Sequence, residues 1–347
     1  AASGFSSQAF APHYPHTERR GETKTCTDCH LSQQNDNNAI MAQLLLQGTD
    51  FVDFLGYNAY VGGEKTLSAV PVTEWDEPQS VIGSYLHRYA YPERYAKHET
   101  RSRVLPEGFS HDSDGTVGCL QHRGEYLYVA EREKGLVVYD IASVANKGFS
   151  QRILTGPSSP LGHDTLVESK AATCVVLPTT QPIHPDRNQG DLMRVTNMEQ
   201  PFFAIYNFAF VTDAEEGLIL VDIDSLYDGE PRDNFLTRAL TWNENGVLDG
   251  VRHLTIAGYW FYFATPKGIV VVNMNDPMKP QYVRTVEMPD VRGSQQQFRY
   301  LFVTTGRGLE VVDITHPDKA YVVADAFVPI RDAHKLHVAR TYAYVAA

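Results

Sequence analysis

The sequence predicts a mainly β protein in which a β-propeller follows a short, partly helical segment. Two observations support this fold class: one two-stranded pattern recurs along most of the chain, and residues 1–50 lack that pattern. Within those first residues, a run of good helix formers begins at Asn37 and ends before Gly48, where a C-terminal cap belongs. We therefore expect two parts, residues 1–50 and residues 51–347.

The recurring pattern consists of an aromatic-rich strand, a tight polar turn, and a β-branched strand that ends in Asp or a related residue. The copies read YNAYVGGEKTLSAVPVT from Tyr57, YLYVAEREKGLVVYDI from Tyr126, NFAFVTDAEEGLILVDI from Asn207, YWFYFATPKGIVVVNM from Tyr259, RYLFVTTGRGLEVVDI from Arg299 and, incompletely, TYAYVAA from Thr341. The copies align on Tyr60, Tyr128, Phe210, Tyr262, Phe302 and Tyr344. The last two steps are about 40 residues, the length of one propeller blade.

The turn of each hairpin is predicted from a glycine. Gly135, Gly217, Gly268 and Gly308 occupy the same place in four copies, where a positive φ is expected, and the first copy has Thr66 instead. A two-stranded unit cannot bury its own face, so such units have to stack in an array. Radial closure of that array removes most exposed edges, which predicts a propeller.

The spacing of the early copies is longer than one blade. We therefore expect insertions on one rim, at about residues 73–115 and 143–200. The sequence stops inside a copy at Ala347, and two explanations stay open: N-terminal strands complete the last blade, or the chain is truncated. The sequence favours truncation, because five full copies and a fragment would otherwise make a small ring.

Residues 26–30 read C-T-D-C-H, the attachment pattern of a c-type haem. The thiols of Cys26 and Cys29 are spaced to add across the two vinyl groups of one haem, and His30 then reaches the iron as proximal ligand. The other interpretations are a thioredoxin-like pair, which should follow a strand in a βαβ unit, and half of a zinc site, which needs a second ligand pair. The sequence lacks both features, so we predict covalent haem c with His30 on its iron.

The second axial ligand is predicted upstream of this motif. His16, and after it His13, lie close enough to Cys26 to fold over the opposite haem face, and each can equally be a structural histidine. Met41 competes as a ligand, but its place on the helix directly after the motif favours packing instead. A looser reserve of ligands consists of His87, His98 and His111, and candidate partners of the haem propionates are Arg19, Arg20 and Lys24.

Composition excludes two classes of partner. The formal net charge of -12 disfavours nucleic acid, whose phosphates reward clustered Lys and Arg. The longest apolar run, around residues 39–46, is far shorter than a membrane span requires. We therefore expect neither nucleic-acid binding nor a transmembrane segment.

The two remaining cysteines and two acidic clusters leave alternatives open. Cys119 and Cys174 are either disulfide-bonded or two buried free thiols. The clusters at residues 111–115 and 222–230 are similar to calcium loops, yet neither has the full ligand series that ends in Glu. Calcium therefore has only weak support.

The strands VVYDI, LILVDI and EVVDI resemble the LVIVD repeat family, whose members are propeller-like and commonly extracellular. The segment PHYPHTERRGETKTCTDCH resembles segments of multihaem cytochromes, in which upstream histidines often ligate a neighbouring haem. The two resemblances together imply the propeller portion of a periplasmic or extracellular multihaem cytochrome. Its expected function is electron transfer rather than catalysis, with other haem groups or cytochromes as redox partners within a protein assembly.

Two further functions remain as alternatives. One is a haem-dependent oxidoreductase with an active site in the propeller, which would draw on His253, His334 or His337. His334 and His337 are three residues apart on what is expected to be a strand, so they would face opposite ways. The other is an adhesion or assembly module in which the haem has a structural role. No GxSxG, Walker or dinucleotide pattern supports a hydrolase or a nucleotide enzyme.

Overall fold

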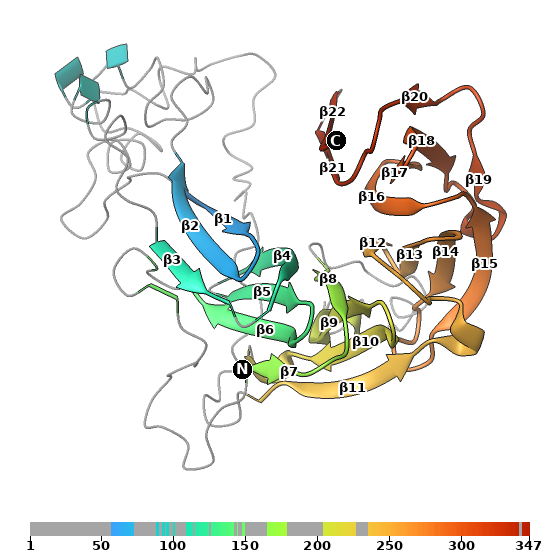
Figure 1. The fold of residues 1–347 in the computed structure, drawn as a ribbon, viewed down its shortest axis with the longest axis horizontal. Helices are drawn as coiled ribbons and strands as arrows, with labels where there is room; N and C mark the ends of the chain where they lie inside the picture. The colour runs from blue at the N-terminus through green and yellow to red at the C-terminus, as the bar shows by residue number, and fades with distance from the viewer. Residues whose placement is uncertain are drawn as a thin grey trace, which may run out of the picture. The chain divides into compact units, whose positions relative to one another are not determined.

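A computed structural model shows the fold (Figure 1). It describes residues 57–72, 88–89, 92–93, 95–96, 100, 109–113, 115–124, 126–141, 144, 148–149, 165–178, 204–226, 235–339 and 342–347. Two compact units are distinguished: one includes Gly62–Thr66 and His111–Ala347, and the other includes the described residues of Ser7–Val61 and Leu67–Ser110. The expected helix of residues 37–47 lies outside the described residues.

The larger unit contains four consecutive antiparallel sheets of four or five strands. The first sheet has the order β4 (Val117–Arg123), β5 (Tyr126–Glu131), β6 (Gly135–Asp140), β7 (Leu166–Val167), and the second has the order β8 (Ala172–Val176), β9 (Phe208–Asp213), β10 (Gly217–Asp222), β11 (Thr237–Trp242). The third runs through β12 (His253–Ala257), β13 (Trp260–Thr265), β14 (Gly268–Asn273), β15 (Gln281–Glu287). The fourth runs through β16 (Val291–Gln297), β17 (Tyr300–Thr305), β18 (Gly308–Asp313), β19 (Tyr321–Val322), with β20 (Val328–Pro329) also paired to β18.

Two smaller sheets account for the first and last copies of the repeat. The last pairs β21 (Leu336–Ala339) with β22 (Tyr342–Val345), and the first has the order β1 (Tyr57–Gly62), β2 (Thr66–Val72), β3 (Phe109–Asp112). All five full copies of the sequence pattern are therefore hairpins, as expected. Short 3₁₀ helices lie at η4 (Ala204–Asn207), η5 (Asp224–Leu226), η6 (Glu244–Gly246) and η7 (Pro317–Lys319).

The hairpin glycines are needed for both conformation and space. Gly268 begins β14 with φ of 155°, and a Cβ there would lie 2.2 Å from the carbonyl oxygen of Val286 on β15. The equivalent glycines all have positive φ: Gly135, Gly217 and Gly308. In the first copy, Thr66 begins β2 and the positive φ falls on Lys65, at 61°. The missing glycine is thus accommodated by moving the left-handed residue one position back.

The acidic end of the repeat also has a structural explanation. The side-chain oxygen of Asp222 accepts a hydrogen bond from the backbone N–H of Asp224 at 2.9 Å. Asn273 and Asp313 accept the same i+2 bond at 2.9 Å. Each of these residues ends the third strand of its sheet, so the recurring Asp or Asn closes the strand with an Asx turn.

The hydrophobic core lies between successive sheets. One cluster joins Val138 of β6 to Val211 and Ile219 of the second sheet. Phe210 and Phe261 form the centre of the next cluster, with ring centroids 4.6 Å apart and an edge-to-face arrangement. A third cluster joins the third and fourth sheets. Each of the four larger sheets therefore buries a face against the next one.

The strands that precede each predicted hairpin were not anticipated. In chain order, the first strands of their sheets are β4, β8, β12, β16 and β21, and each contacts the next one. We call these five strands the inner strands. Parts of both stretches assigned to insertions also belong to sheets: β3 falls within residues 73–115, and β7 and β8 fall within residues 143–200.

Candidate functional site

The inner strands line a cavity of about 560 Å³. Its wall combines polar and apolar groups from all five strands, and η4 adds Ile205. The polar part includes Thr255, Ser294 and Gln295, together with the imidazoles of His253 and His337. Its volume lies within the range of small-molecule sites.

Strand pairing places one residue on, or directly before, each inner strand at the same level. Five residues make up this level, which we call the inner layer: Cys119, Cys174, His253, Gly293 and Lys335. Their partners on the second strands occupy equivalent positions: Ala130, Thr212, Ala264, Thr304 and Ala346. The inner layer therefore contains two sulfurs, an imidazole and an ammonium from residues scattered along the sequence, and of its members Cys119, Cys174 and His253 line the cavity.

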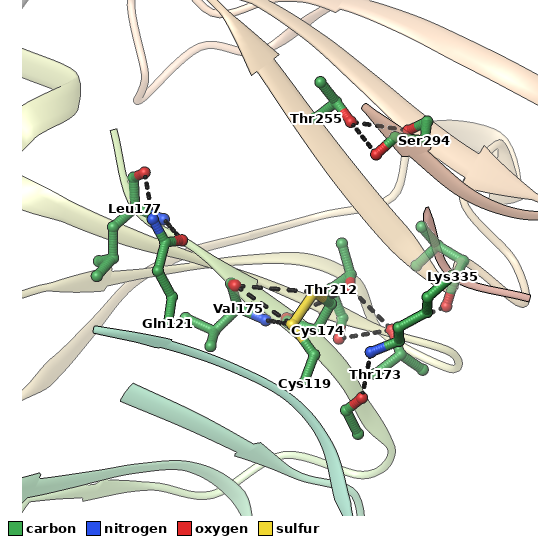
Figure 2. Close-up of a disulfide and its surroundings, with 12 residues drawn as sticks. Cys119, Gln121, Thr173, Cys174, Val175, Leu177, Thr212, Thr255, Ser294 and Lys335 are labelled. Atoms are coloured by element: carbon green, nitrogen blue, oxygen red, sulfur yellow. Dashed lines mark hydrogen bonds between the residues drawn. A yellow bond between two sulfur atoms is a disulfide. The ribbon is translucent and has the colours of Figure 1, made fainter. Parts of the chain in front are cut away.

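A disulfide occupies one side of the inner layer. Cys119 and Cys174 are bonded, with Cα atoms 4.7 Å apart, and they join the inner strands of the first and second sheets (Figure 2). The backbone N–H of Val175 donates to the Cys119 sulfur at 3.4 Å. Of the two alternatives left open by the sequence, the structure therefore shows the disulfide.

The adjacent level of the cavity holds glutamine side chains that join neighbouring sheets. Gln121 donates from Nε2 to the Leu177 carbonyl at 3.2 Å and accepts from the Leu177 N–H at 2.7 Å. Gln295 makes the same pair of bonds with Val338, at 3.5 and 2.7 Å. Thr255 donates to the carbonyl of Ser294 at 2.9 Å, so three of the junctions between inner strands are fixed by side chains.

His253 is a neutral histidine within this cavity. Burial, followed by the nearby Lys335 charge, lowers the pKa of His253 to about 4. Its Nδ1 is inaccessible to solvent and has no hydrogen-bond partner among the described residues. The imidazole is therefore uncharged at neutral pH and retains a free ring nitrogen.

Lys335 supplies the positive charge of the inner layer. Its Nζ donates to the carbonyl of Gly118 at 2.7 Å, which joins β4 to the segment before β21 (Figure 2). Burial of the ammonium lowers the pKa of Lys335, and the charge of Arg132 lowers it further. No carboxylate in the described parts of the chain pairs with this ammonium.

A second group of charged residues lies at the start of the inner strands. Arg252 and Arg292 both contact Asp290, with N–O distances of 2.6 and 2.9 Å. Arg292 also pairs with Asp332 at 2.5 Å, and Asp332 lies 3.3 Å from His334. Hydrogen bonds from Arg252 and then from Arg292 lower the pKa of Asp290 despite some burial. These pairs are largely satisfied and connect three sheets.

The histidines proposed for a propeller active site are separated by the structure. His253 and His337 line the same cavity, whereas His334 belongs to the charged group with Asp332. His334 also lies before β21 rather than on it, so the expected alternation along one strand does not apply to the pair. Another histidine, His111, packs against Tyr139 with ring centroids 5.3 Å apart.

The predicted haem ligands lie outside the described residues. They are Cys26, Cys29, His30, His16 and His13. The same holds for the competing and supporting residues Met41, His87, His98, Arg19, Arg20 and Lys24. For these residues the fit to a haem rests on the donor chemistry of the sequence: two thiols and an adjacent imidazole.

The described residues contain neither a group of metal ligands nor a membrane-spanning helix. None of those residues form a group of three or more His, Cys, Asp or Glu side chains that could hold a metal ion. In the first acidic cluster, Ser113 donates to the Gly115 carbonyl at 2.8 Å and shapes a turn. Among the same residues, no helix has the length and apolar character that crossing a membrane requires.

Comparison with known proteins identifies the repeat. The LVIVD repeat matches residues 114–155 and 205–225, which contain the hairpins β5–β6 and β9–β10. LVIVD repeats are therefore present in a β-rich chain of several antiparallel sheets. No curated protein matches the sequence.

Three of the solved structures to which the chain is similar share little of its sequence. The computationally designed Ika8 protein is 10% identical over 84% of this chain and 65% of its own, with a TM-score of 0.42. U3-55K is 14% identical over 66% of this chain and 57% of its own, with a TM-score of 0.42. The Neurospora crassa Pan2 WD40 domain is 12% identical over 70% of this chain and 62% of its own, with a TM-score of 0.40. The chain thus spans less than two thirds of the length of each of these structures.

Proposed function

We propose that this protein is an extracytoplasmic electron-transfer cytochrome, in which a c-type haem segment is carried by an LVIVD-repeat propeller. The C-T-D-C-H pattern of residues 26–30 is the observation that carries the proposal. Cys26 and Cys29 would hold the haem through two thioether bonds, and His30 would be the proximal iron ligand. His16, or otherwise His13, would be the distal ligand.

A bound haem of this kind supplies a one-electron redox couple whose potential depends on its axial ligands and surroundings. The chain's own residues would hold the haem through its thioether bonds and axial ligands. Two histidine ligands would keep the coordination complete in both oxidation states, so that no substrate position is left open. The proposal therefore assigns electron transfer rather than catalysis, with other haem groups or cytochromes as partners.

The described sheets support a scaffold and docking role for the propeller. Hydrophobic cores join successive sheets, and the disulfide and the glutamine bonds join neighbouring inner strands. Such a surface changes little on binding, which favours fast association and release of a redox partner. Fold alone does not assign this role, because propellers carry many functions.

The disulfide also supports the proposed location. Disulfides persist in the periplasm and outside cells, and they are rare in reducing compartments. Cys119 and Cys174 would therefore be bonded in the same oxidising environment to which we assign the haem segment. We propose a periplasmic or extracellular protein on these grounds.

An enzyme is the second candidate because two of its expected histidines belong to one cavity wall. His253 and His337 line one cavity of about 560 Å³, which is large enough for a small substrate. In this alternative, electrons from the haem would serve chemistry in the propeller, and the iron could also retain an open coordination position.

A visible spectrum with carbon monoxide distinguishes the two candidates. The full chain would be produced with its haem, and reduced-minus-oxidised spectra would be recorded with and without carbon monoxide. Electron transfer predicts a low-spin haem whose spectrum carbon monoxide does not change, and replacement of the distal ligand by His16→Ala or His13→Ala should open the site. A high-spin haem that binds carbon monoxide in the unmodified protein would contradict the proposal and favour the enzyme.

A further inference from the structure

The edge of β22 that faces away from β21 is unpaired among the described residues. β21 and β22 form a two-stranded sheet, whereas the second strand of each larger sheet lies between two other strands (Figure 1). The repeat places β22 at that second position, because Tyr344 aligns with Tyr128 of β5 and Tyr262 of β13. In an antiparallel strand, every second residue directs its backbone N–H and C=O toward one neighbour. β22 therefore presents free backbone groups along one edge.

The side chains of β22 show the same lack of a neighbour. Tyr342 is 68% exposed and Tyr344 is 62% exposed, whereas Tyr128 and Tyr262 are buried. The two exposed rings lie near each other, with centroids 6.4 Å apart. Natural edge strands are commonly protected by a charge, a proline or a bulge, but β22 reads YAYV and pairs with β21 without a register shift. The strand is thus an open template for a further strand.

The larger sheets define the kind of strand that fits this edge. On their second strands, the aligned aromatic residue is opposite an aliphatic residue of the third strand: Val138, Leu220, Val271 or Val311. The aromatic residue two positions earlier is opposite an acidic or amide residue: Asp140, Asp222, Asn273 or Asp313. A matching strand would therefore run antiparallel to β22, with an aliphatic side chain opposite Tyr344 and an Asp or Asn opposite Tyr342.

The parts of this chain that the structure describes contain no spare strand of that kind. The third strands of the five full copies are β2, β6, β10, β14 and β18, and each already lies between two neighbours. A second copy of the chain has the same strands, engaged in the same way. Residues 1–50 lack the sequence pattern of the repeat. The matching strand has therefore to come from a different polypeptide.

We propose that β22 binds an extended segment of a different protein, which adds to the β21–β22 sheet as its third strand. The segment has the character of the third strand of the repeat: a run of aliphatic, mainly β-branched residues that ends in Asp or Asn. Backbone hydrogen bonds to the free edge supply affinity, and the two tyrosine rings fix the register. This inference does not depend on the haem segment or on electron transfer.

A labelled peptide copied from β18 is a suitable probe, because its Glu and Asp favour solubility. The peptide is RGLEVVDIT, residues 307–315, and fluorescence anisotropy measures its binding to the full chain. We expect saturable binding with a Kd below about 1 mM. A peptide with Val311→Pro and Val312→Pro should bind about tenfold more weakly or worse, because it lacks N–H groups that the edge requires. Equal binding of the two peptides would overturn the proposal, as would no binding up to about 1 mM.

Variants of exposed tyrosines test whether the peptide binds at β22. The double variant Tyr342→Ala, Tyr344→Ala should weaken peptide binding by about fivefold or more, since two cross-strand pairs are lost. Both tyrosines are exposed, so the variant should fold normally. Tyr282→Ala, on the exposed outer strand β15, is the matched control and should bind the peptide normally. Unchanged affinity in the double variant would contradict the assignment.

Amide hydrogen exchange of the full chain then locates the added strand and separates the other occupants. The peptide should slow exchange in β22 and leave β15 unchanged. Protection of β15 instead of β22 would overturn the proposal. Protection of β22 in a dimer without peptide would assign the edge to a second copy, and protection in the free monomer would show that the chain itself covers it. Either result would also overturn the proposal.

Discussion

The amide of Gln121 forms hydrogen bonds with both backbone groups of Leu177, at 3.2 and 2.7 Å, and so joins the first two four-stranded sheets. Gln295 repeats this arrangement with Val338 between the fourth sheet and β21. The two glutamines occupy equivalent positions, opposite Tyr128 and Phe302 of the aligned aromatic residues. The bond pattern is therefore a property of the repeat rather than an accident at one junction.

Replacement of Gln121 by leucine should destabilise the protein by about 1 to 3 kcal/mol, because the buried N–H and carbonyl of Leu177 lose their partners. Gln295→Leu should have a similar effect at its own junction. Gln281→Leu, at an exposed position of β15, is the control and should change the free energy of unfolding by less than about 0.5 kcal/mol. Urea denaturation measures the free energy of unfolding of all three variants. An equal loss of that free energy in Gln121→Leu and Gln281→Leu would refute the role of this bond pair.

The Cys119–Cys174 disulfide should add to the stability of the same junction. It closes a loop across a sequence separation of 55, for which chain entropy gives about 4 kcal/mol. The double variant Cys119→Ala, Cys174→Ala should therefore unfold at a lower urea concentration than the oxidised protein. Dithiothreitol should destabilise the unmodified protein and leave the double variant unchanged. A reductant effect of the same size on both proteins would show that the disulfide is not its cause.

Two glycines provide a matched test of the hairpin turns. Gly268→Ala would place a Cβ 2.2 Å from the Val286 carbonyl oxygen, so we expect a loss of about 3 kcal/mol or more. Gly258 also has positive φ, at 64°, but a Cβ there meets nothing within 4 Å. Gly258→Ala should therefore cost only the conformational strain of about 1 to 2 kcal/mol. Thermal unfolding compares the stability of the two variants. A larger loss of stability in Gly258→Ala than in Gly268→Ala would contradict this account of the turns.

The titration of His253 should make stability depend on pH. Its pKa is about 4 in the folded chain against an ordinary value of 6.5, so between these values the unfolded state binds more protons. Stability should therefore rise with pH across this window and become constant above it, by about 1 to 3 kcal/mol in total. His253→Gln removes the titrating group. Denaturation curves at pH 4.5 to 7.5 that keep the same slope in this variant would assign the dependence to other groups.

The hairpins were predictable from the sequence because their middle strands are buried on both faces. Such strands read as dense β-branched runs, as at Ile269–Val272, and the glycine before them fixes the turn. The inner strands were missed because several of them contain many polar residues. Val117–Arg123 reads VGCLQHR and Val291–Gln297 reads VRGSQQQ, which lack that apolar character.

The candidate site depends on contacts that local patterns do not encode. The sequence left the state of Cys119 and Cys174 open, because bonding requires proximity between strands that are 55 residues apart. Lys335 was not singled out, since its partner Gly118 lies 217 residues away. By contrast, the haem motif is a local pattern in which the two thiols and the histidine each have a chemical role, so five residues are enough to predict it. It remains a prediction.

The intact mass of the full chain, produced in cells that attach haem to exported proteins, tests the central claim most directly. The account predicts the mass of the chain plus one haem, retained after denaturation because the bonds to Cys26 and Cys29 are covalent, and the mass of the chain alone for the variant Cys26→Ser, Cys29→Ser. A denatured, unmodified chain that carries no haem would contradict the assignment of a c-type cytochrome.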